Sequence, residues 1–108
     1  MPLPVQVKLQ KKHVKNQMKI YNNCINFIIK IKKKIHNLNC NFRNSYKYKS
    51  KYFPNNNKEL YLYRDNLMDM LYDWNKLLDV NLKNYNKYNE LLTLQLNNLL
   101  YLEILNSK

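Results

Sequence analysis

The residues best suited to chemistry are basic and aromatic side chains that interleave in the stretch FRNSYKYKSKYF, residues 42–53. Lysines at a phosphate backbone release condensed counterions, and aromatic rings stack on unpaired bases with about 1–3 kcal/mol each. A contact with single-stranded or folded RNA needs both groups on one segment. Only two of the 19 basic residues are arginines, which favours backbone contact over the bidentate recognition of guanine.

The two signs of charge are separated along the chain. Residues 1–58 hold 14 basic residues and no acidic one (+14), whereas residues 59–108 hold 5 basic and 7 acidic residues (−2), which together give the net charge of +12. A segment without internal counter-charge repels itself and orders best against a negative surface. Nucleic acid is the first candidate for that surface, an acidic protein or anionic membrane face is the second, and a merely solvated basic segment is the third.

We therefore predict that the basic first half contacts RNA through its lysines, one arginine and the tyrosines interleaved with them. The predicted RNA-binding residues are Lys8, Lys11, Lys12, Lys15, Lys19, Lys30, Lys32, Lys33, Lys34, Arg43, Tyr46, Lys47, Tyr48, Lys49, Lys51 and Tyr52.

Several kinds of catalytic and metal site are excluded or disfavoured. The chain has no glycine, so it cannot form a Walker A loop or a dinucleotide fingerprint. Cys24 and Cys40, with His13 and His36, do not match a familiar metal-ligand spacing. We expect two reduced thiols, with a disulfide or a shared metal site as the alternative. The three serines lack a companion base and acid, so we expect no enzymatic activity, catalytic residue, cofactor, metal or small-molecule substrate.

Apolar periodicity predicts a mainly α fold. Residues 1–12 read as an extended arm because Pro2 and Pro4 disfavour helix. Cys24, Ile28 and Ile31 begin a helical face that continues through residue 38, so we predict a helix over about 13–38. The alternation in FIIKIKKKI, residues 27–35, is the argument for a strand there. Residues 39–57 are predicted to be an irregular loop rich in lysine and tyrosine.

The second half, residues 59–108, is predicted to be a helical region that meets other proteins. Its asparagine-rich stretch 81–89 suggests a break between two helices, and one long helix is the alternative because no glycine or proline follows Pro54. Fifty residues make a thin core, so we expect burial against another subunit, against the first helix, or both. The predicted interface residues are Leu60, Tyr63, Leu67, Met70, Trp74, Leu77, Leu92, Leu96 and Leu99.

Two resemblances bear on function. Leu62-Tyr63-Arg64 is similar to the tripeptide of the LYR family, small helical proteins that serve respiratory complexes, iron–sulfur assembly and mitoribosome assembly; in that family a phenylalanine follows in the next helix, and here none follows Phe53. In composition and layout, a basic extension beside a modest helical part, the chain resembles small ribosomal proteins of organelles.

These patterns predict a structural RNA-binding subunit of a mitochondrial ribosome, with rRNA and neighbouring subunits as partners. The absence of glycine and alanine beside 20 asparagines and 17 lysines indicates an AT-rich gene, from an organellar genome or a very AT-rich nucleus, and we expect the mitochondrial matrix or another organelle with an AT-rich genome. We read the Arg-poor first half as mature sequence, and the stretch 91–105 as too short and too polar to span a bilayer. The alternatives are a helical accessory subunit of a mitochondrial respiratory or ATP synthase complex, with membrane contact left open, and a coiled-coil interaction protein.

Overall fold

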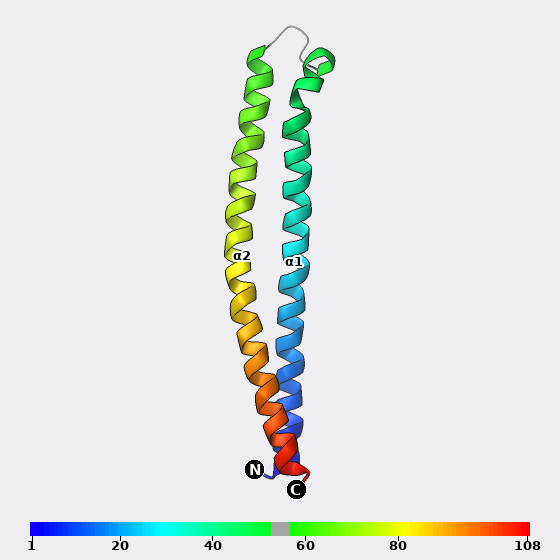
Figure 1. Cartoon of the computed structure of the whole chain (residues 1–108), viewed down its shortest axis with the longest axis vertical. Helices are drawn as coiled ribbons and strands as arrows, with labels where there is room; N and C mark the ends of the chain where they lie inside the picture. The colour runs from blue at the N-terminus through cyan, green and yellow to red at the C-terminus, as the bar shows by residue number, and fades with distance from the viewer. Residues whose placement is uncertain (53–56) are drawn as a thin grey trace. The chain divides into compact units, whose positions relative to one another are not determined.

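Two helices make up nearly all of the chain in the computed structural model (Figure 1), which describes the backbone of residues 1–52 and 57–108 and the side chains of residues 1–45 and 58–108. Helix α1 runs over Leu3–Tyr52 and helix α2 over Asn57–Asn106. The described residues contain no strand, so the predicted mainly α fold is confirmed and the strand alternative for residues 27–35 is wrong.

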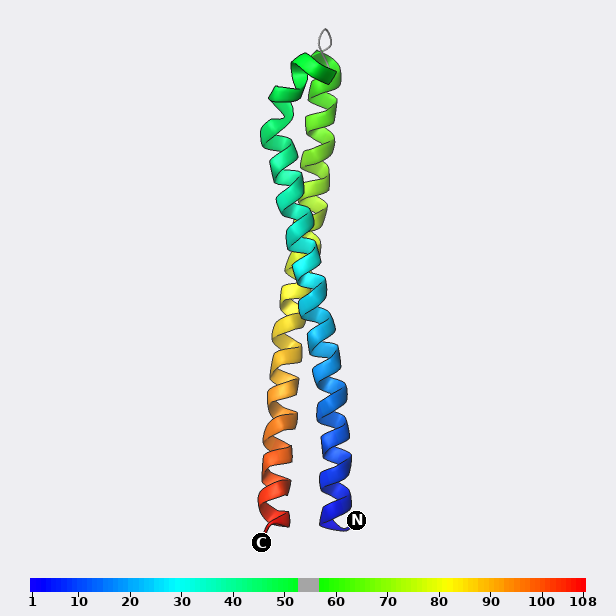
Figure 2. The ribbon, with the colours of Figure 1, turned by 90° about the vertical axis from the view of Figure 1, so that its right-hand side faces the viewer.

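The chain divides into two compact units, each built from part of α1 and part of α2. Unit 1 comprises Met1–Phe27 and Asn81–Lys108, and unit 2 comprises Ile28–Val80. In unit 1 the two segments lie side by side and run in opposite directions, with both chain termini at the same end (Figure 2). In unit 2 the two segments also run antiparallel on either side of residues 53–56. The predicted division into an RNA-contacting part, 1–58, and a protein-interaction part, 59–108, is one of function and stays a prediction.

The residues that face the opposite helix recur in both helices at alternating spacings of four and three. This is the seven-residue repeat with which two helices keep one seam in contact. The seam of α1 consists of Leu3, Val7, Gln10, Val14, Gln17, Tyr21, Cys24, Ile28, Ile31, Ile35, Leu38, Phe42 and Ser45, and all of these side chains are buried or half-buried. The seam of α2 consists of Leu60, Arg64, Leu67, Leu71, Trp74, Leu78, Asn81, Tyr85, Tyr88, Leu92, Gln95, Leu99 and Leu102, likewise buried or half-buried.

The seam of unit 2 is largely apolar. Ile31 is fully buried, Leu60 is 1% exposed and Leu38 is 3% exposed. Burying such a side chain contributes about 1.5–3 kcal/mol. One charged group enters this seam: the guanidinium of Arg64 lies 4.5 Å from the centre of the Phe42 ring, a cation–π contact between α2 and α1.

The seam of unit 1 contains polar side chains joined by hydrogen bonds. The Gln10 amide donates to Gln95 Oε1 at 2.6 Å and to the Gln95 carbonyl at 3.1 Å. The Tyr21 hydroxyl donates to the Tyr85 hydroxyl at 3.2 Å, and their ring centres are 5.5 Å apart. These bonds satisfy groups that would otherwise be costly to bury, and they favour one register of the two helices.

The predicted extended arm at residues 1–12 is wrong, because α1 begins at Leu3. Proline is tolerated in the first turn of a helix, where the backbone N–H has no intrahelical partner in any case. The Pro2 carbonyl accepts hydrogen bonds from the N–H groups of Val5 and Gln6, at 3.1 and 3.0 Å. Val7 and Gln10 then bury against α2, which supplies the apolar contact that the arm lacks by itself.

The predicted irregular loop at residues 39–57 is wrong for residues 39–52, because α1 extends to Tyr52. The seam repeat continues through Phe42 and Ser45, and Ser45 is fully buried. The Ser45 hydroxyl donates to the Phe42 carbonyl at 2.7 Å, which keeps that polar group satisfied within the helix. Residues 53–56 lie outside the described residues.

The predicted break at residues 81–89 is absent, and the alternative of one long helix is confirmed by α2. Asparagine is a mediocre helix former, but tertiary contacts override a weak preference of this kind. Asn81 lies on the seam, where its carbonyl is 3.8 Å from the thiol of Cys24, and Tyr85 and Tyr88 follow it on the same face.

Three of the predicted interface residues of the second half lie one position before a seam residue. Met70 and Leu77 are exposed, at 43% and 36%, and Tyr63 is half-buried. The seam positions beside these three are occupied by Arg64, Leu71 and Leu78. Leu71 and Leu78 are as apolar as Met70 and Leu77, so apolar periodicity alone does not choose between the two phases. Whether Met70 and Leu77 meet another protein stays a prediction.

Because Ile31 is fully buried in the unit 2 seam, we expect Ile31→Ala to lower the free energy of unfolding by about 2–5 kcal/mol. Urea unfolding followed by circular dichroism measures this loss. The matched control is Ile29→Ala, a residue that is 45% exposed on the same helix, and its effect should stay within about 0.5 kcal/mol. Equal losses of unfolding free energy in the two variants would contradict the placement of Ile31 in the seam.

The hydrogen bond to Tyr85 raises the pKa of the Tyr21 hydroxyl above its ordinary value of 10.0, and burial raises it further. Because this pKa is higher in the folded protein than in the unfolded chain, it contributes to the free energy of unfolding. The contribution is complete below pH 10 and is lost as the pH rises through the raised pKa. We expect Tyr85→Phe to lower the Tyr21 pKa toward 10.0, as measured by NMR titration of labelled tyrosine rings. The control Tyr101→Phe, at an exposed position on α2, should leave the Tyr21 pKa unchanged. A Tyr21 pKa that does not change in Tyr85→Phe would refute the claim that the hydrogen bond to Tyr85 raises it.

Candidate nucleic-acid interface

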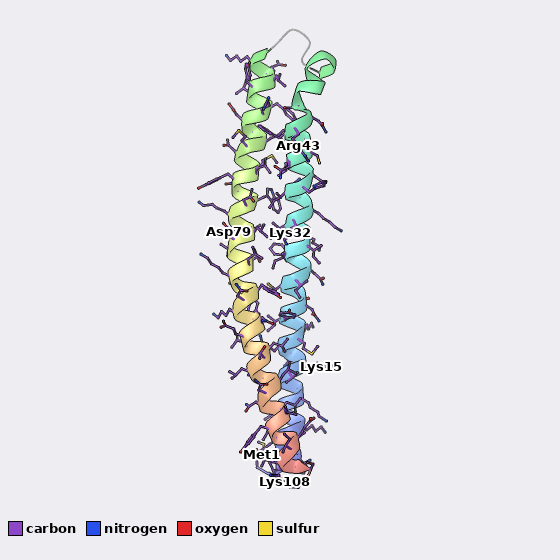
Figure 3. All side chains as sticks on the ribbon, in the orientation of Figure 1. Met1, Lys15, Lys32, Arg43, Asp79 and Lys108 are labelled. Atoms are coloured by element: carbon purple, nitrogen blue, oxygen red, sulfur yellow. The ribbon has the colours of Figure 1, made fainter. Side chains whose placement is uncertain are left out.

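The ten predicted basic residues whose side chains the structure describes all lie on the surface of α1. Each of them is exposed: Lys8, Lys11, Lys12, Lys15, Lys19, Lys30, Lys32, Lys33, Lys34 and Arg43. Lys15, Lys32 and Arg43 can be followed along α1 in Figure 3, and Asp79 marks the other helix. Because α1 contains no acidic residue, its exposed surface carries one sign of charge.

Four of these lysines form a line on unit 1, which we call the basic stripe: Lys8, Lys12, Lys15 and Lys19. An α-helix turns 100° and rises 1.5 Å per residue, so their Cα atoms fall within an arc of about 60° and span about 16 Å. The seam residues Val7 and Val14 point away from this arc and toward α2. The same packing that buries the seam therefore aims the stripe outward.

The stripe meets little opposing charge within the protein. Among the described side chains, the one ion pair that involves an α1 lysine joins Lys11 Nζ to Glu103 at 3.8 Å, beside the stripe. Lysines three or four residues apart repel each other by about 0.2–0.5 kcal/mol per pair. Lys8, Lys12, Lys15 and Lys19 contain three such pairs in sequence, so a bound polyanion would relieve repulsion that α2 leaves in place.

Asparagines continue the stripe toward unit 2, a feature that the sequence analysis missed. Asn22 and Asn26 follow Lys19 at the same helical spacing, and both are exposed. A shallow hollow of about 480 Å³ is lined by Lys15, Asn16, Met18, Lys19, Asn22 and Asn23. The spacing of Asn22 and Asn26 in the sequence already places them on the same helical face as the lysines, although they carry no charge.

The structure does not test the aromatic part of the predicted RNA site, which consists of Tyr46, Tyr48 and Tyr52. Phe42, which opens the interleaved stretch, is half-buried under Arg64 and does not offer its ring to a ligand. The remaining predicted contacts of that stretch lie outside the described side chains: Tyr46, Lys47, Tyr48, Lys49, Lys51 and Tyr52. Their role as RNA contacts stays a prediction.

The predicted protein-interface residues divide by exposure. Leu60 and Leu67 are buried against α1 within unit 2, so they already have an intramolecular partner. Met70, Leu77 and Leu96 are exposed. The other four are half-buried: Tyr63, Trp74, Leu92 and Leu99. Other exposed apolar side chains lie in the last turns of α2: Leu94, Leu100, Tyr101 and Ile104.

The cysteines and histidines do not assemble a metal site in the described part of the chain, where no group of three or more histidine, cysteine or acidic side chains lies close enough to hold an ion. Cys40 Sγ is 3.6 Å from His36 Nε2 and 3.6 Å from Arg43 Nη2, all on α1. Cys24 is buried in the unit 1 seam, and both thiols are free. The predicted reduced state therefore agrees with the structure, and the alternative Cys24–Cys40 disulfide does not.

Neither helix, over the described residues, has a segment long and apolar enough to cross a membrane. Comparison with known proteins gave no matching family model, no matching curated protein and no matching solved structure.

Proposed function

We propose that the chain is a structural RNA-binding subunit of a mitochondrial ribosome, in which the outward face of α1 lies on rRNA and α2 meets neighbouring proteins. The observation that carries the proposal is the charge of α1: ten exposed basic side chains and no acidic residue in the helix. A surface of one sign attracts a polyanion over a long range and gains affinity by releasing its counterions.

The regular helix supports this role because it fixes the positions of the charges. The seam holds α1 against α2 in each unit, so the lysines of the basic stripe are presented without ordering a loop on binding. An ordered site loses less conformational entropy when it binds than a flexible one. Lysine is a point charge that suits phosphate, which fits binding to a backbone more than reading of bases.

Helix α2 supports the second half of the proposal. Leu94 is 62% exposed and Tyr101 is 60% exposed, and Leu100 and Ile104 lie within the same last turns. Exposed apolar side chains gathered on a short stretch are typical of protein contact surfaces. These residues leave α2 as the helix suited to meet neighbouring subunits.

The second candidate is a helical accessory subunit of a mitochondrial respiratory or ATP synthase complex. The exposed leucines of α2 favour it equally, because they would suit a protein neighbour in any large assembly. In that case the lysines of α1 would face acidic subunits or lipid headgroups. The two candidates differ in whether RNA holds the protein in its complex.

Sedimentation of an organellar extract tests the proposal directly. We expect the protein to travel with ribosomal particles, and to be released by high salt or by RNase because its contacts are electrostatic and made to RNA. Migration with a detergent-solubilised membrane complex, insensitive to RNase, would support the second candidate and contradict the first.

The purified chain should bind RNA with an affinity that falls steeply with salt. About six phosphate contacts give a slope near −4 in a plot of log affinity against log salt concentration. We expect Lys12→Gln/Lys19→Gln to weaken binding and to reduce this slope by about 1.4, since each lost phosphate contact contributes about 0.7 on single-stranded RNA. Fluorescence anisotropy with a labelled RNA measures both quantities.

The matched control is Lys83→Gln/Lys87→Gln, which removes the same charge from exposed positions of α2 in the same unit. Its slope should stay close to that of the unaltered chain. If both pairs of substitutions weaken binding equally, net charge rather than the face of α1 determines affinity. Circular dichroism verifies that each variant keeps its helices.

A further inference from the structure

The basic stripe has the geometry of a rigid, straight row of cations. Lys8, Lys12, Lys15 and Lys19 lie within an arc of about 60° on one face of a continuous helix. All four are exposed, and Asn22 and Asn26 prolong the row on the same face. Such a row cannot follow an irregular strand, but it can lie along phosphates whose positions are already fixed.

In the described part of α1, no aromatic side chain lies on the basic stripe. Single strands are held largely by aromatic side chains on which bases stack. In unit 1, Tyr21 donates its hydroxyl to Tyr85 in the seam. Phe27 is 45% exposed, but it lies about 100° around the helix from the stripe. In unit 2, Phe42 is covered by Arg64.

The asparagines supply groups that suit ribose. A side-chain amide both donates and accepts hydrogen bonds, as a 2′-hydroxyl does. Lys15, Lys19 and the amides of Asn16, Asn22 and Asn23 line one shallow hollow. The row therefore presents four cations followed by the amides of Asn22 and Asn26, and these groups suit the phosphates and 2′-hydroxyls exposed along the wide, shallow minor groove of an RNA duplex.

On this basis, and resting on the proposed function, we propose that the outward face of α1 in unit 1 binds the sugar–phosphate backbone of double-stranded RNA without regard to sequence. The lysines contact phosphate oxygens, and Asn22 and Asn26 contact 2′-hydroxyls. No arginine lies on this face of unit 1 to recognise guanine, so sequence should matter little.

The test titrates the full chain with four labelled probes of equal length: two RNA duplexes of different sequence, a DNA duplex, and an unstructured single-stranded RNA. We expect equal affinity for the two RNA duplexes. Each should bind about tenfold more tightly than the single strand, because a duplex presents twice the charge per unit length. The RNA duplex should also bind about tenfold more tightly than the DNA duplex, through the 2′-hydroxyl contacts.

A pair of variants isolates the amides. We expect Asn22→Ala/Asn26→Ala to abolish the preference for RNA over DNA duplex while leaving DNA binding unchanged. Asn97→Ala/Asn98→Ala, at exposed positions of α2, is the matched control and should keep the preference.

Each outcome is decisive. A single strand that binds as tightly as the duplexes, or affinities that differ between the two RNA sequences, overturns this inference and leaves the proposed RNA-binding function standing. Equal binding of RNA and DNA duplexes overturns the role of the amides. If no probe binds in low salt, the proposed function itself fails.

Discussion

The seam between α1 and α2 is the contact on which the rest of the structure depends. Helix α1 carries 13 basic residues and no acidic one over Leu3–Tyr52, and a helix of like charges is destabilised by its own surface. The residues that face α2 in each unit recur at spacings of four and three and are buried or half-buried. The burial of these residues offsets the repulsion between the lysines. The outward positions of α1 take no part in this burial, so lysine and asparagine can occupy them.

The seam has a different composition in the two units. Unit 2 relies on apolar burial by residues such as Ile31 and Leu38, with the contact of Arg64 and Phe42 as its polar element. Unit 1 places Gln10 against Gln95 and Tyr21 against Tyr85, with hydrogen bonds in which a shifted register would leave buried polar groups unsatisfied. Polar contacts therefore help to specify the register in both units. The raised pKa of Tyr21 reports directly on one of the specifying contacts.

The separation of charge between the helices acquires a structural meaning from this packing. Because the seam residues are uncharged apart from Arg64, charge pairing between the helices takes place at the edge of the seam, as in the pair of Lys11 with Glu103. The exposed lysines of α1, and the exposed leucines and Tyr101 of α2, are the surfaces on which the proposed contacts with RNA and with protein rest.

Sequence alone determined the helical character, the charge separation and the buried face of Cys24, Ile28, Ile31 and Leu38. An apolar period of 3.6 residues and a count of charges can both be obtained without knowing which residues are in contact in the folded chain. It failed at residues 1–12, 39–52 and 81–89, where local preferences of proline, tyrosine and asparagine argue against helix. Contacts with the opposite helix override those preferences, and such contacts join residues far apart in the chain: Gln10 with Gln95, or Phe42 with Arg64. The candidate site divides in the same way, since its lysines are evident from composition. Only the packing of the seam against α2 determines that the lysines point to solvent, because the face of α1 that is buried fixes the direction of the opposite face.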